Sequence, residues 1–314
     1  LSEEKYRNII TKLKTKYREL NKEYQDHKNL YEEMAEAIEL QLENIEKRFL
    51  EFETAMDQNQ YTDVVHIVKA LDTMIEHMEI VISEVPDLLL MCKQMVPKRV
   101  KEIEDTKEKM ESDGYPLDFL SIDDNMAEAK KNVSVIIDRI KVLNLEDCMF
   151  ELKTILDYLD SIFVAFEKER LSRKVYEEAS KDFEKKLNKT VKLVTDIYEQ
   201  LDDIENMYDL NKEDVKIIDE VNKDLTVIKD DHHKMLEKVK NKATPYSSVN
   251  DEVEKLSNRL KQVESTLDIA LKSLGNMYED EQRAREQLKE IERLLKECKE
   301  KMREEYKKNM LRVR

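Results

Sequence analysis

Glycine and proline are scarce in this sequence of 314 residues, which contains 2 Gly and 4 Pro. These two residues mark most turns and helix ends, so their scarcity leaves few places where a helix can break. Tryptophan is absent and aromatic residues make up only 6%, a composition that disfavours strands. With two glycines, neither a GxGxxG nor a Walker A loop can be written, which excludes the common phosphate-binding loops.

Groups that carry catalysis or bind metals are also few. The sequence has three cysteines, which are Cys92, Cys148 and Cys298. They lack metal-ligand spacing, and each lies on an apolar helical stripe, which predicts buried free thiols in a reducing compartment. The five histidines are His27, His66, His77, His232 and His233, and they form no HExxH motif. His232 occupies a core position, where a hydrogen-bonded or partly exposed imidazole in a loose bundle layer is favoured over a metal ligand or a pH switch.

We therefore predict a protein that is not an enzyme. No catalytic, cofactor-binding or metal-binding residue is assigned, no cofactor is expected, and the sequence does not identify binding residues.

Charged residues make up 40% of the sequence and the net charge is −16. Phosphate binding requires concentrated Lys and Arg, so nucleic acid is excluded as a partner. No apolar run of about 18 residues occurs, which predicts a soluble chain. The sequence begins at Leu1 rather than Met, which suggests an excised fragment, so the lack of an anchor here does not exclude one in the parent protein. The basic stretch 301–314 is interpreted as an ordinary charged helix face.

Hydrophobic spacing predicts long helices. The second predicted helix has apolar residues at alternating steps of 3 and 4, which keep one stripe on one face of a helix. Its stripe consists of Tyr61, Val64, Val68, Leu71, Ile75, Met78, Ile82, Val85, Leu89, Cys92 and Val96. Pro86 and Pro97 lie inside this pattern without shifting its phase, so we expect them to kink the helix rather than end it.

Two other helices are predicted to be unusually long. The first runs about 55 residues to Asp57, because the spacing from Leu13 to Tyr24 stays in phase with that from Tyr31 to Met56. The fourth runs about 60 residues from Leu145 and carries two parallel apolar stripes. A face that wide requires two neighbouring helices rather than one.

Short turns between such helices make sequential neighbours antiparallel. The predicted fold is therefore all-α, an elongated rod of tandem spectrin-like antiparallel three-helix bundles with long shared helices. The expected repeats are the end of one repeat at 1–27, complete repeats at 28–170 and 171–280, and the start of another at 281–314. Ser121 with Asp124 suggests a capping box, and Ser248 is expected to cap the following helix in the same way.

One segment resembles a known family. The stretch from Ile82 to Pro97 reads ISEVPDLLLMCKQMVP, and 113–117 reads DGYPL. Two prolines at this spacing inside a heptad helix, followed by the GYPL turn, resemble the septation ring formation regulator EzrA of Gram-positive bacteria. The turn 59–62 is also similar, and the order of helices extends the resemblance across all 314 residues.

The resemblance implies a cell-division role. EzrA proteins are membrane-tethered rods of spectrin-like repeats, held at the cytoplasmic face of the membrane at the division septum by one N-terminal helix that this sequence lacks. They interact with the tubulin-like protein FtsZ, modulate the formation and placement of its ring, and scaffold other division and cell-wall synthesis proteins. Self-association is left open, and no family binding residue maps onto this sequence.

Two alternatives stay open at this point. The chain would be the coiled-coil arm of a larger ATPase if its helices paired in twos. It would be a generic cytoskeletal spacer if it had no specific partner.

Overall fold

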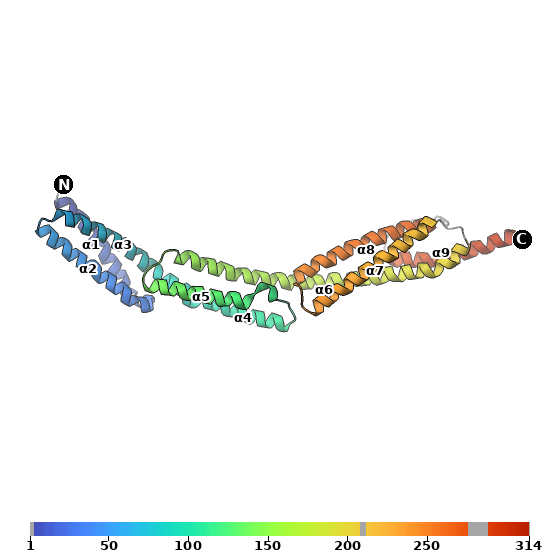
Figure 1. Cartoon of the computed structure of the whole chain (residues 1–314), viewed down its shortest axis with the longest axis horizontal. Helices are drawn as coiled ribbons and strands as arrows, with labels where there is room; N and C mark the ends of the chain where they lie inside the picture. Colours follow the sequence, from blue (N-terminus) through green and yellow to red (C-terminus); the bar gives the residue numbers. More distant parts are fainter. Residues whose placement is uncertain (1–2, 208–211, 276–287, 314) are drawn as a thin grey trace. The chain divides into compact units, whose positions relative to one another are not determined.

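The described residues form helices joined by turns. The computed structural model describes residues 3–207, 212–275 and 288–313 (Figure 1). No β-strand occurs within these ranges, which confirms the predicted all-α fold. In chain order the elements are α1 (Glu3–Asp26), η1 (Lys28–Met34), α2 (Ala35–Asp57), α3 (Tyr61–Leu90), η2 (Met91–Met95), α4 (Val96–Ser112), η3 (Asp118–Leu120), α5 (Ile122–Lys141), α6 (Cys148–Met207), α7 (Lys212–Lys240), α8 (Tyr246–Gly275) and α9 (Leu288–Val313).

Contacts divide the chain into two compact units. Unit 1 takes in the described residues of 1–110 and 120–164, and unit 2 takes in those of 111–119 and 165–314. Helix α6 is 60 residues long and supplies residues to both units. The prediction of one helix of this length is therefore confirmed, while the boundaries of the repeats remain a prediction.

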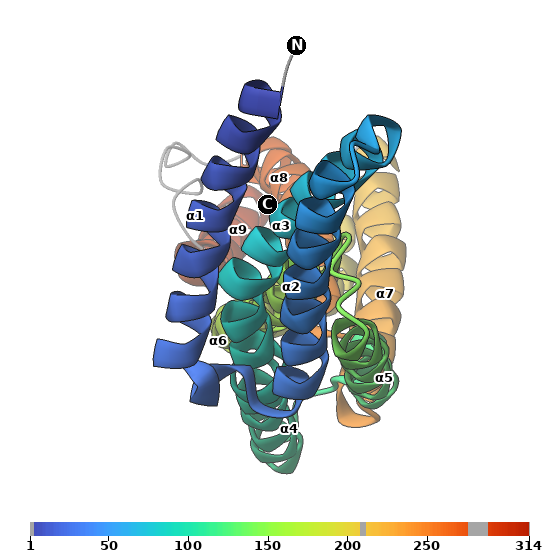
Figure 2. The same ribbon diagram turned by 90° about the vertical axis from the view of Figure 1, so that its left-hand side faces the viewer.

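Helices α1, α2 and α3 lie side by side in unit 1 (Figure 2). The prediction of a single helix up to Asp57 is wrong, because the chain reverses at η1 and α1 runs antiparallel to α2. Arg7 Nη1 lies 3.7 Å from Glu53 Oε2, and the Tyr24 hydroxyl donates to the Ala35 carbonyl at 3.3 Å. The reversal includes Glu32, whose backbone leaves the helical region at φ 48 and ψ −127.

Periodicity gave no sign of this reversal. The stripe of α1 and the stripe of α2 both face α3 and remain in phase across the turn, so one seam describes two helices. The turn contains neither glycine nor proline, the residues that usually mark such a break.

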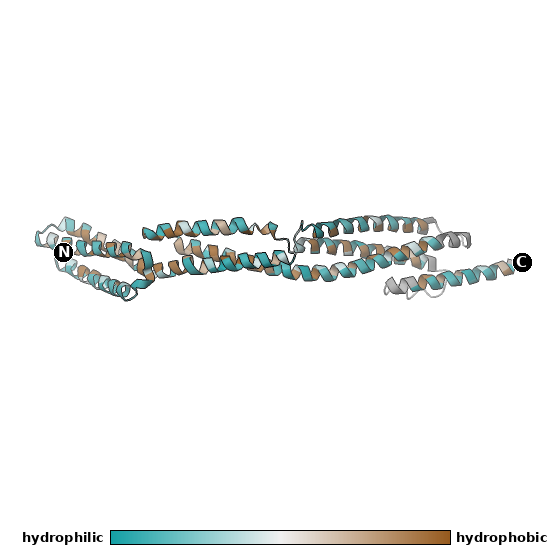
Figure 3. Ribbon diagram, turned by 90° about the horizontal axis from the view of Figure 1, so that it is seen from below, coloured by the Kyte–Doolittle hydropathy of each residue, from teal (hydrophilic) through white to brown (hydrophobic). Residues whose placement is uncertain are grey.

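The core of unit 1 is a continuous apolar seam. Tyr24, Tyr31, Phe52 and Leu71 are among its largest fully buried side chains. Hydrophobic turns alternate with polar turns along the helices (Figure 3). This alternation suits partly buried helices. Within the described part of the chain, no helix contains a stretch long and apolar enough to cross a membrane.

Helices α4, α5 and α6 complete unit 1. Lys130 on α5 pairs with Glu104 on α4 at 3.0 Å, and Arg99 on α4 pairs with Asp160 on α6 at 3.0 Å. These are partly exposed pairs at the edges of the apolar seam, so they align helices more than they stabilise them.

The core of unit 2 is built from α6, α7 and α8, with Leu295 of α9 packed against it. Helix α6 has a neighbour on each of two sides. Its Phe183 ring contacts the His232 ring of α7 at 5.0 Å between centroids, and its Glu169 bonds to the first turn of α8. The wide apolar face predicted to need two covering helices is the first half of α6, in unit 1, where α6 pairs with α4 through Arg99–Asp160 and with α5 through Arg139–Glu151.

Three helices end in the same way, with a left-handed residue that is not glycine. These residues are Asn59 after α2, Leu143 after α5 and Lys242 after α7. After α2, the Gln60 N–H donates to the Ala55 carbonyl, five residues back, at 2.9 Å. This is the Schellman motif, which places glycine at the left-handed position in most proteins. The scarcity of glycine therefore has a structural cost, since side chains occupy strained backbone positions.

The two predicted serine caps are wrong. Ser121 precedes α5 with a left-handed backbone, φ 47, and its side chain makes no capping hydrogen bond. Helix α8 starts at Tyr246, so Ser248 lies inside its first turn. The first N–H groups of α8 are bonded instead by Glu169, a residue 77 positions earlier.

Candidate functional site: the proline-flanked junction of α3 and α4

Pro86 lies within α3, and the structure repairs the hydrogen bond that it removes. Proline has no N–H, so the carbonyl of Ile82 loses its helical partner. The Tyr31 hydroxyl, from η1, donates to that carbonyl at 2.7 Å. Burial raises the pKa of Tyr31 to about 12, so the hydroxyl keeps its proton throughout the physiological range. A buried defect in one helix is thus satisfied by a side chain from the neighbouring turn.

Pro97 is accommodated by a different device. The five residues before α4 form a π-helix, and the Val96 N–H donates to the Met91 carbonyl five residues back. A π-turn inserts one residue into the helical ladder. It lies where the ring of Pro97 would otherwise crowd the carbonyl of Lys93. The prediction that the prolines do not end the helix is confirmed, since helical structure runs from Tyr61 to Ser112, while the predicted kinks stay a prediction.

Lys93, in the π-helix, holds the η1 turn through two carboxylates. Its Nζ lies 2.6 Å from Glu33 Oε2 and also contacts Glu32. The hydrogen bond from Lys93 lowers the pKa of Glu33. Burial lowers the pKa of Lys93, but the hydrogen bonds that Lys93 donates to Glu32 and Glu33 outweigh burial and raise it. The contacts of Lys93 with both carboxylates hold the strained backbone of Glu32 in place.

Cys92 lies in the same π-helix and is buried, as the sequence predicted. Burial raises the pKa of its thiol to about 12, and burial also raises the pKa of Cys148. Thiols that stay protonated are weak nucleophiles. Cys298 is only half-buried.

The GYPL turn belongs to unit 2, where its tyrosine completes an aromatic cluster. The Tyr115 and Tyr246 rings meet edge to face at 5.9 Å. The guanidinium of Arg173 lies 4.6 Å from the Tyr115 ring centroid, and Arg173 donates to the Asp113 carbonyl at 2.6 Å. Gly114 adopts φ 93, which only glycine tolerates easily. The turn therefore places the Tyr115 ring and the Asp113 carbonyl against the guanidinium of Arg173.

Glu169 caps α8 from α6. Its two carboxylate oxygens accept the N–H of Tyr246 at 3.0 Å and of Ser247 at 3.3 Å, and the residue is 1% exposed. A carboxylate at a helix N-terminus bonds unpaired donors and interacts favourably with the helix dipole. Sequence reasoning missed this cap because helix caps are sought within a few residues of the helix they serve.

His232 lies at a core position of unit 2, as predicted, but it is buried, whereas a hydrogen-bonded or partly exposed imidazole was expected. Its Nε2 has no hydrogen-bond partner, and burial lowers the pKa of the imidazole. The other four histidines are exposed and dispersed. Among the described residues, no group of three His, Cys, Asp or Glu side chains is placed to hold a metal ion.

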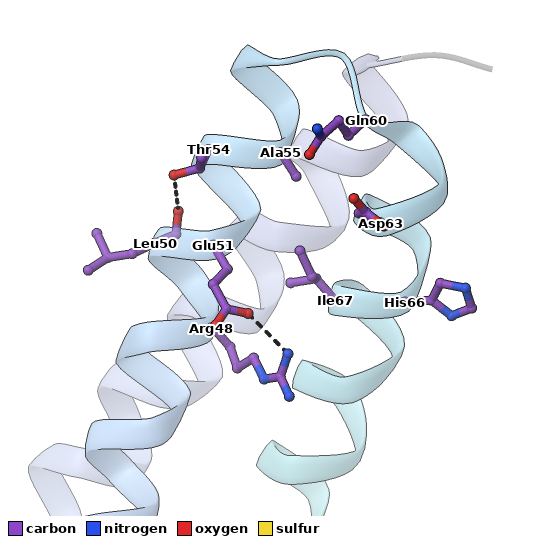
Figure 4. Close-up of a pocket in the computed structure, with 9 residues that line it drawn as sticks. All are labelled: Arg48, Leu50, Glu51, Thr54, Ala55, Gln60, Asp63, His66 and Ile67. Atoms are coloured by element: carbon purple, nitrogen blue, oxygen red, sulfur yellow. Dashed lines mark hydrogen bonds and ion pairs between the residues drawn. The ribbon is translucent and has the colours of Figure 1, made fainter.

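A hollow of about 530 Å³ lies between α2 and α3 (Figure 4). Arg48 and Glu51 pair at 3.0 Å on one of its walls, while the Leu50 side chain points away from the hollow. Its lining residues include neither a nucleophile with an adjacent base nor a pair of converging acids. We therefore interpret the hollow as a surface depression without a catalytic arrangement.

The comparison with known families decides what kind of protein carries these motifs. Residues 1–306 match the family described as "Septation ring formation regulator, EzrA". The chain belongs to the EzrA family. The matched region includes both the proline-flanked junction and the GYPL turn, so the resemblance predicted from these residues is confirmed.

Curated EzrA proteins are distant relatives of this chain. Septation ring formation regulator EzrA of a Staphylococcus epidermidis strain is 21% identical over 90% of the chain and 50% of its own length. Those of Geobacillus sp. and Bacillus licheniformis are 24% and 23% identical, covering 81% and 94% of the chain and 45% and 53% of their own lengths. The chain spans about half the length of these EzrA relatives. No solved structure matches it.

Proposed function

We propose that this chain is an internal structural segment of a regulator of septation ring formation and has no catalytic activity. The observation that carries the proposal is the family match over residues 1–306. The fold supports it, because the buried groups that the sequence offered for chemistry are packed as structural elements. Cys92 and Cys148 are protonated core thiols, and His232 is a core imidazole.

The proposed mechanism is geometric. Long helices such as α6 set the distance between a membrane anchor, supplied by a part of the protein outside this sequence, and the division ring at the cytoplasmic face of the membrane. The partner at the ring is FtsZ, and other division and cell-wall synthesis proteins bind the helical faces. The proposal retains the repeats predicted at 28–170 and 171–280, flanked by partial repeats at 1–27 and 281–314.

The junction of α3 and α4 has a structural role in this proposal. Tyr31 and Lys93 hold the α1–α2 hairpin against a helix that two prolines weaken. The segment from Ile82 to Pro97, which carries the resemblance to the family, is then explained by the architecture of unit 1 rather than by a contact with FtsZ.

Co-sedimentation tests the proposal. The full-length protein, and a form from which the 314 residues are deleted, are each centrifuged with FtsZ polymers. We expect the deletion to lose most of its pelleted fraction, since the segment both positions and presents binding faces. Equal pelleting of the two forms would contradict a role for this segment in FtsZ binding.

A further inference from the structure

The turn between α1 and α2 lacks the residues that usually make a turn. Residues 27–33 read HKNLYEE and contain neither glycine nor proline, and each of these residue types is tolerated inside a helix. Glu32 adopts φ 48 and ψ −127, close to the first central position of a type II′ turn, where glycine is the usual residue. A side chain at this position strains the backbone. The sequence of the turn itself therefore does not favour the reversal.

The stripe of buried side chains continues through this turn in phase. A buried side chain recurs at every seventh position, at Tyr17, Tyr24, Tyr31, Ile38, Ile45 and Phe52. A seven-residue repeat keeps such side chains on one face of a single helix. If residues 27–33 became helical, α1 and α2 would join into one helix from Glu3 to Asp57, about 80 Å long at 1.5 Å per residue. The sequence therefore fits two conformations, a closed hairpin, which is the form in the structure, and an open continuous helix.

Helix α1 is held on α2 and α3 by few buried side chains. It buries five of its 24 residues, whereas α3 buries ten of its 30. The Tyr17 hydroxyl donates to Glu46 at 2.7 Å, and the Tyr24 hydroxyl donates to Glu39 at 3.0 Å. The ion pairs at its edges are partly exposed and stabilise weakly; they join Arg7 and Lys14 to Glu53, and Lys16 to Glu79. Because local opening costs least where little apolar surface is buried, α1 is the part of this bundle that detaches most readily.

Lys93 fastens the turn in the closed form. Its Nζ lies 2.6 Å from Glu33 Oε2 and also contacts Glu32. These charge-assisted contacts join the turn to η2, and they hold Glu32 in its non-helical conformation. Removing them leaves the strain at Glu32 without its main compensation, so the balance between the closed and the open form depends on this one lysine.

We propose that α1 is a strap with two positions and that Lys93 is the latch that keeps it closed. In the open form residues 27–33 become helical, the strain at Glu32 is released, and α1 swings away from α2 and α3. Opening lengthens α2 into one helix and uncovers the apolar face of α2 and α3 on which α1 lies. This conformational change adds to the structural role proposed for unit 1 and does not depend on FtsZ binding.

Double electron–electron resonance on the 314-residue chain tests the proposal. Spin labels are attached at Lys12→Cys and Lys47→Cys, two exposed positions, in a Cys298→Ser background. The labels lie close together in the antiparallel hairpin, whereas 35 positions of continuous helix separate them by about 50 Å. Lys93→Met is expected to raise the population at the long distance about fivefold or more, because the charge-assisted contacts of the latch are lost. Lys98→Met, which removes an exposed lysine of α4, is the matched control and is expected to leave the population unchanged.

Two substitutions at Glu32, each made in the Lys93→Met background, separate the backbone from the charge. Glu32→Gly and Glu32→Ala remove the same carboxylate. Glycine adopts φ 48 without strain and disfavours a helix, so Glu32→Gly is expected to lower the open population. Alanine keeps the strain and favours a helix, so Glu32→Ala is expected to raise it. No long-distance population in Lys93→Met, an equal one in Lys98→Met, or changes of the same sign in Glu32→Gly and Glu32→Ala would each overturn the proposal.

Discussion

The cores of the two units differ in polarity. Among the described residues, the buried polar or charged side chains are Glu169, Ser180, Thr190 and His232, and all four belong to unit 2. Unit 1 buries polar atoms mainly as tyrosine hydroxyls, which donate to carbonyls or carboxylates, as Tyr31 does to Ile82. The same helical architecture thus contains two kinds of core. We expect the stability of unit 1 to be independent of pH near neutrality, and the stability of unit 2 to depend on it.

The difference follows from which groups titrate. Burial raises the pKa of Tyr17, Tyr24 and Tyr31 in unit 1, so these hydroxyls stay protonated at neutral pH. In unit 2, burial lowers the pKa of His232 and raises the pKa of Glu264. Both shifts show that the fold disfavours the charged form of the group. Unit 2 therefore loses stability when either of these groups is ionised.

The largest effect is expected in the apolar core of unit 1. Leu159 is fully buried, so Leu159→Asp would bury an unpaired charge and lower the free energy of unfolding by about 4 kcal/mol or more. Thermal denaturation followed by circular dichroism measures the change. Lys153→Asp, on the exposed face of the same helix, is the control and is expected to change little. An unchanged melting temperature for Leu159→Asp would refute the seam that defines the core.

The next effect concerns the remote cap in unit 2. Glu169→Ala leaves the Tyr246 and Ser247 N–H groups without their acceptor in a buried site, and we expect a loss of about 2–3 kcal/mol. Glu167→Ala, two residues away and exposed, removes a carboxylate without removing a cap. Denaturant unfolding compares the two variants, and equal midpoints would show that the cap contributes nothing.

A smaller effect is expected from the buried imidazole, and it depends on pH. The pKa of His232 is below its ordinary value of 6.5 in the folded state, so the unfolded chain takes up a proton first as the pH falls. Stability is complete above about pH 6.5 and declines as the pH falls from there through the folded-state pKa. His232→Leu should flatten this part of the pH profile, while His233→Leu should only reduce it, because His233 contributes less than burial to the lowered pKa of His232. A profile that is unchanged in His232→Leu would assign the pH dependence to other groups.

The smallest effect concerns the helix ends without glycine. Lys242 is exposed and left-handed, φ 54, at the end of α7. Lys242→Gly should stabilise unit 2 by about 1 kcal/mol, because glycine adopts this backbone without strain. Asn59→Gly should stabilise unit 1 by less, because asparagine tolerates the left-handed region better than lysine does. Chemical denaturation measures the free energy of unfolding of both variants. A lower free energy of unfolding for Lys242→Gly than for the wild-type chain would contradict the strain assigned to this helix end.

Much of this fold was accessible from the sequence, for reasons that also explain the errors. The 3,4 spacing located the seams of α3 and α6 because a helix buries the same face along its whole length. The same spacing concealed the reversal at η1, because Tyr24 and Tyr31 lie seven residues apart on either side of it, in phase, and their rings pack against each other at 5.0 Å. Local patterns carry no information about such a tertiary partner.

The candidate site was predicted in the same partial way. Pro86 and Pro97 identified the junction, since their effect on a helix is local and known. Tyr31 and Lys93 act across gaps of 51 and 61 residues along the chain, and Glu169 acts across 77. The spacing of residues in a single sequence does not link positions so far apart. The only local signal was Lys93, a cation between the two prolines that indicates a carboxylate partner.

The most direct test of the central claim, that this segment acts through its fold and not through a reactive group, is made in dividing cells. Cells whose only copy of the full-length protein carries Leu159→Asp in this segment are compared with cells carrying Lys153→Asp, and fluorescent FtsZ rings are counted and located. The account predicts that the Leu159→Asp cells match cells lacking the protein in ring number and placement, and that the Lys153→Asp cells match wild type. Normal rings in cells that contain the unfolded Leu159→Asp protein at wild-type abundance would contradict it.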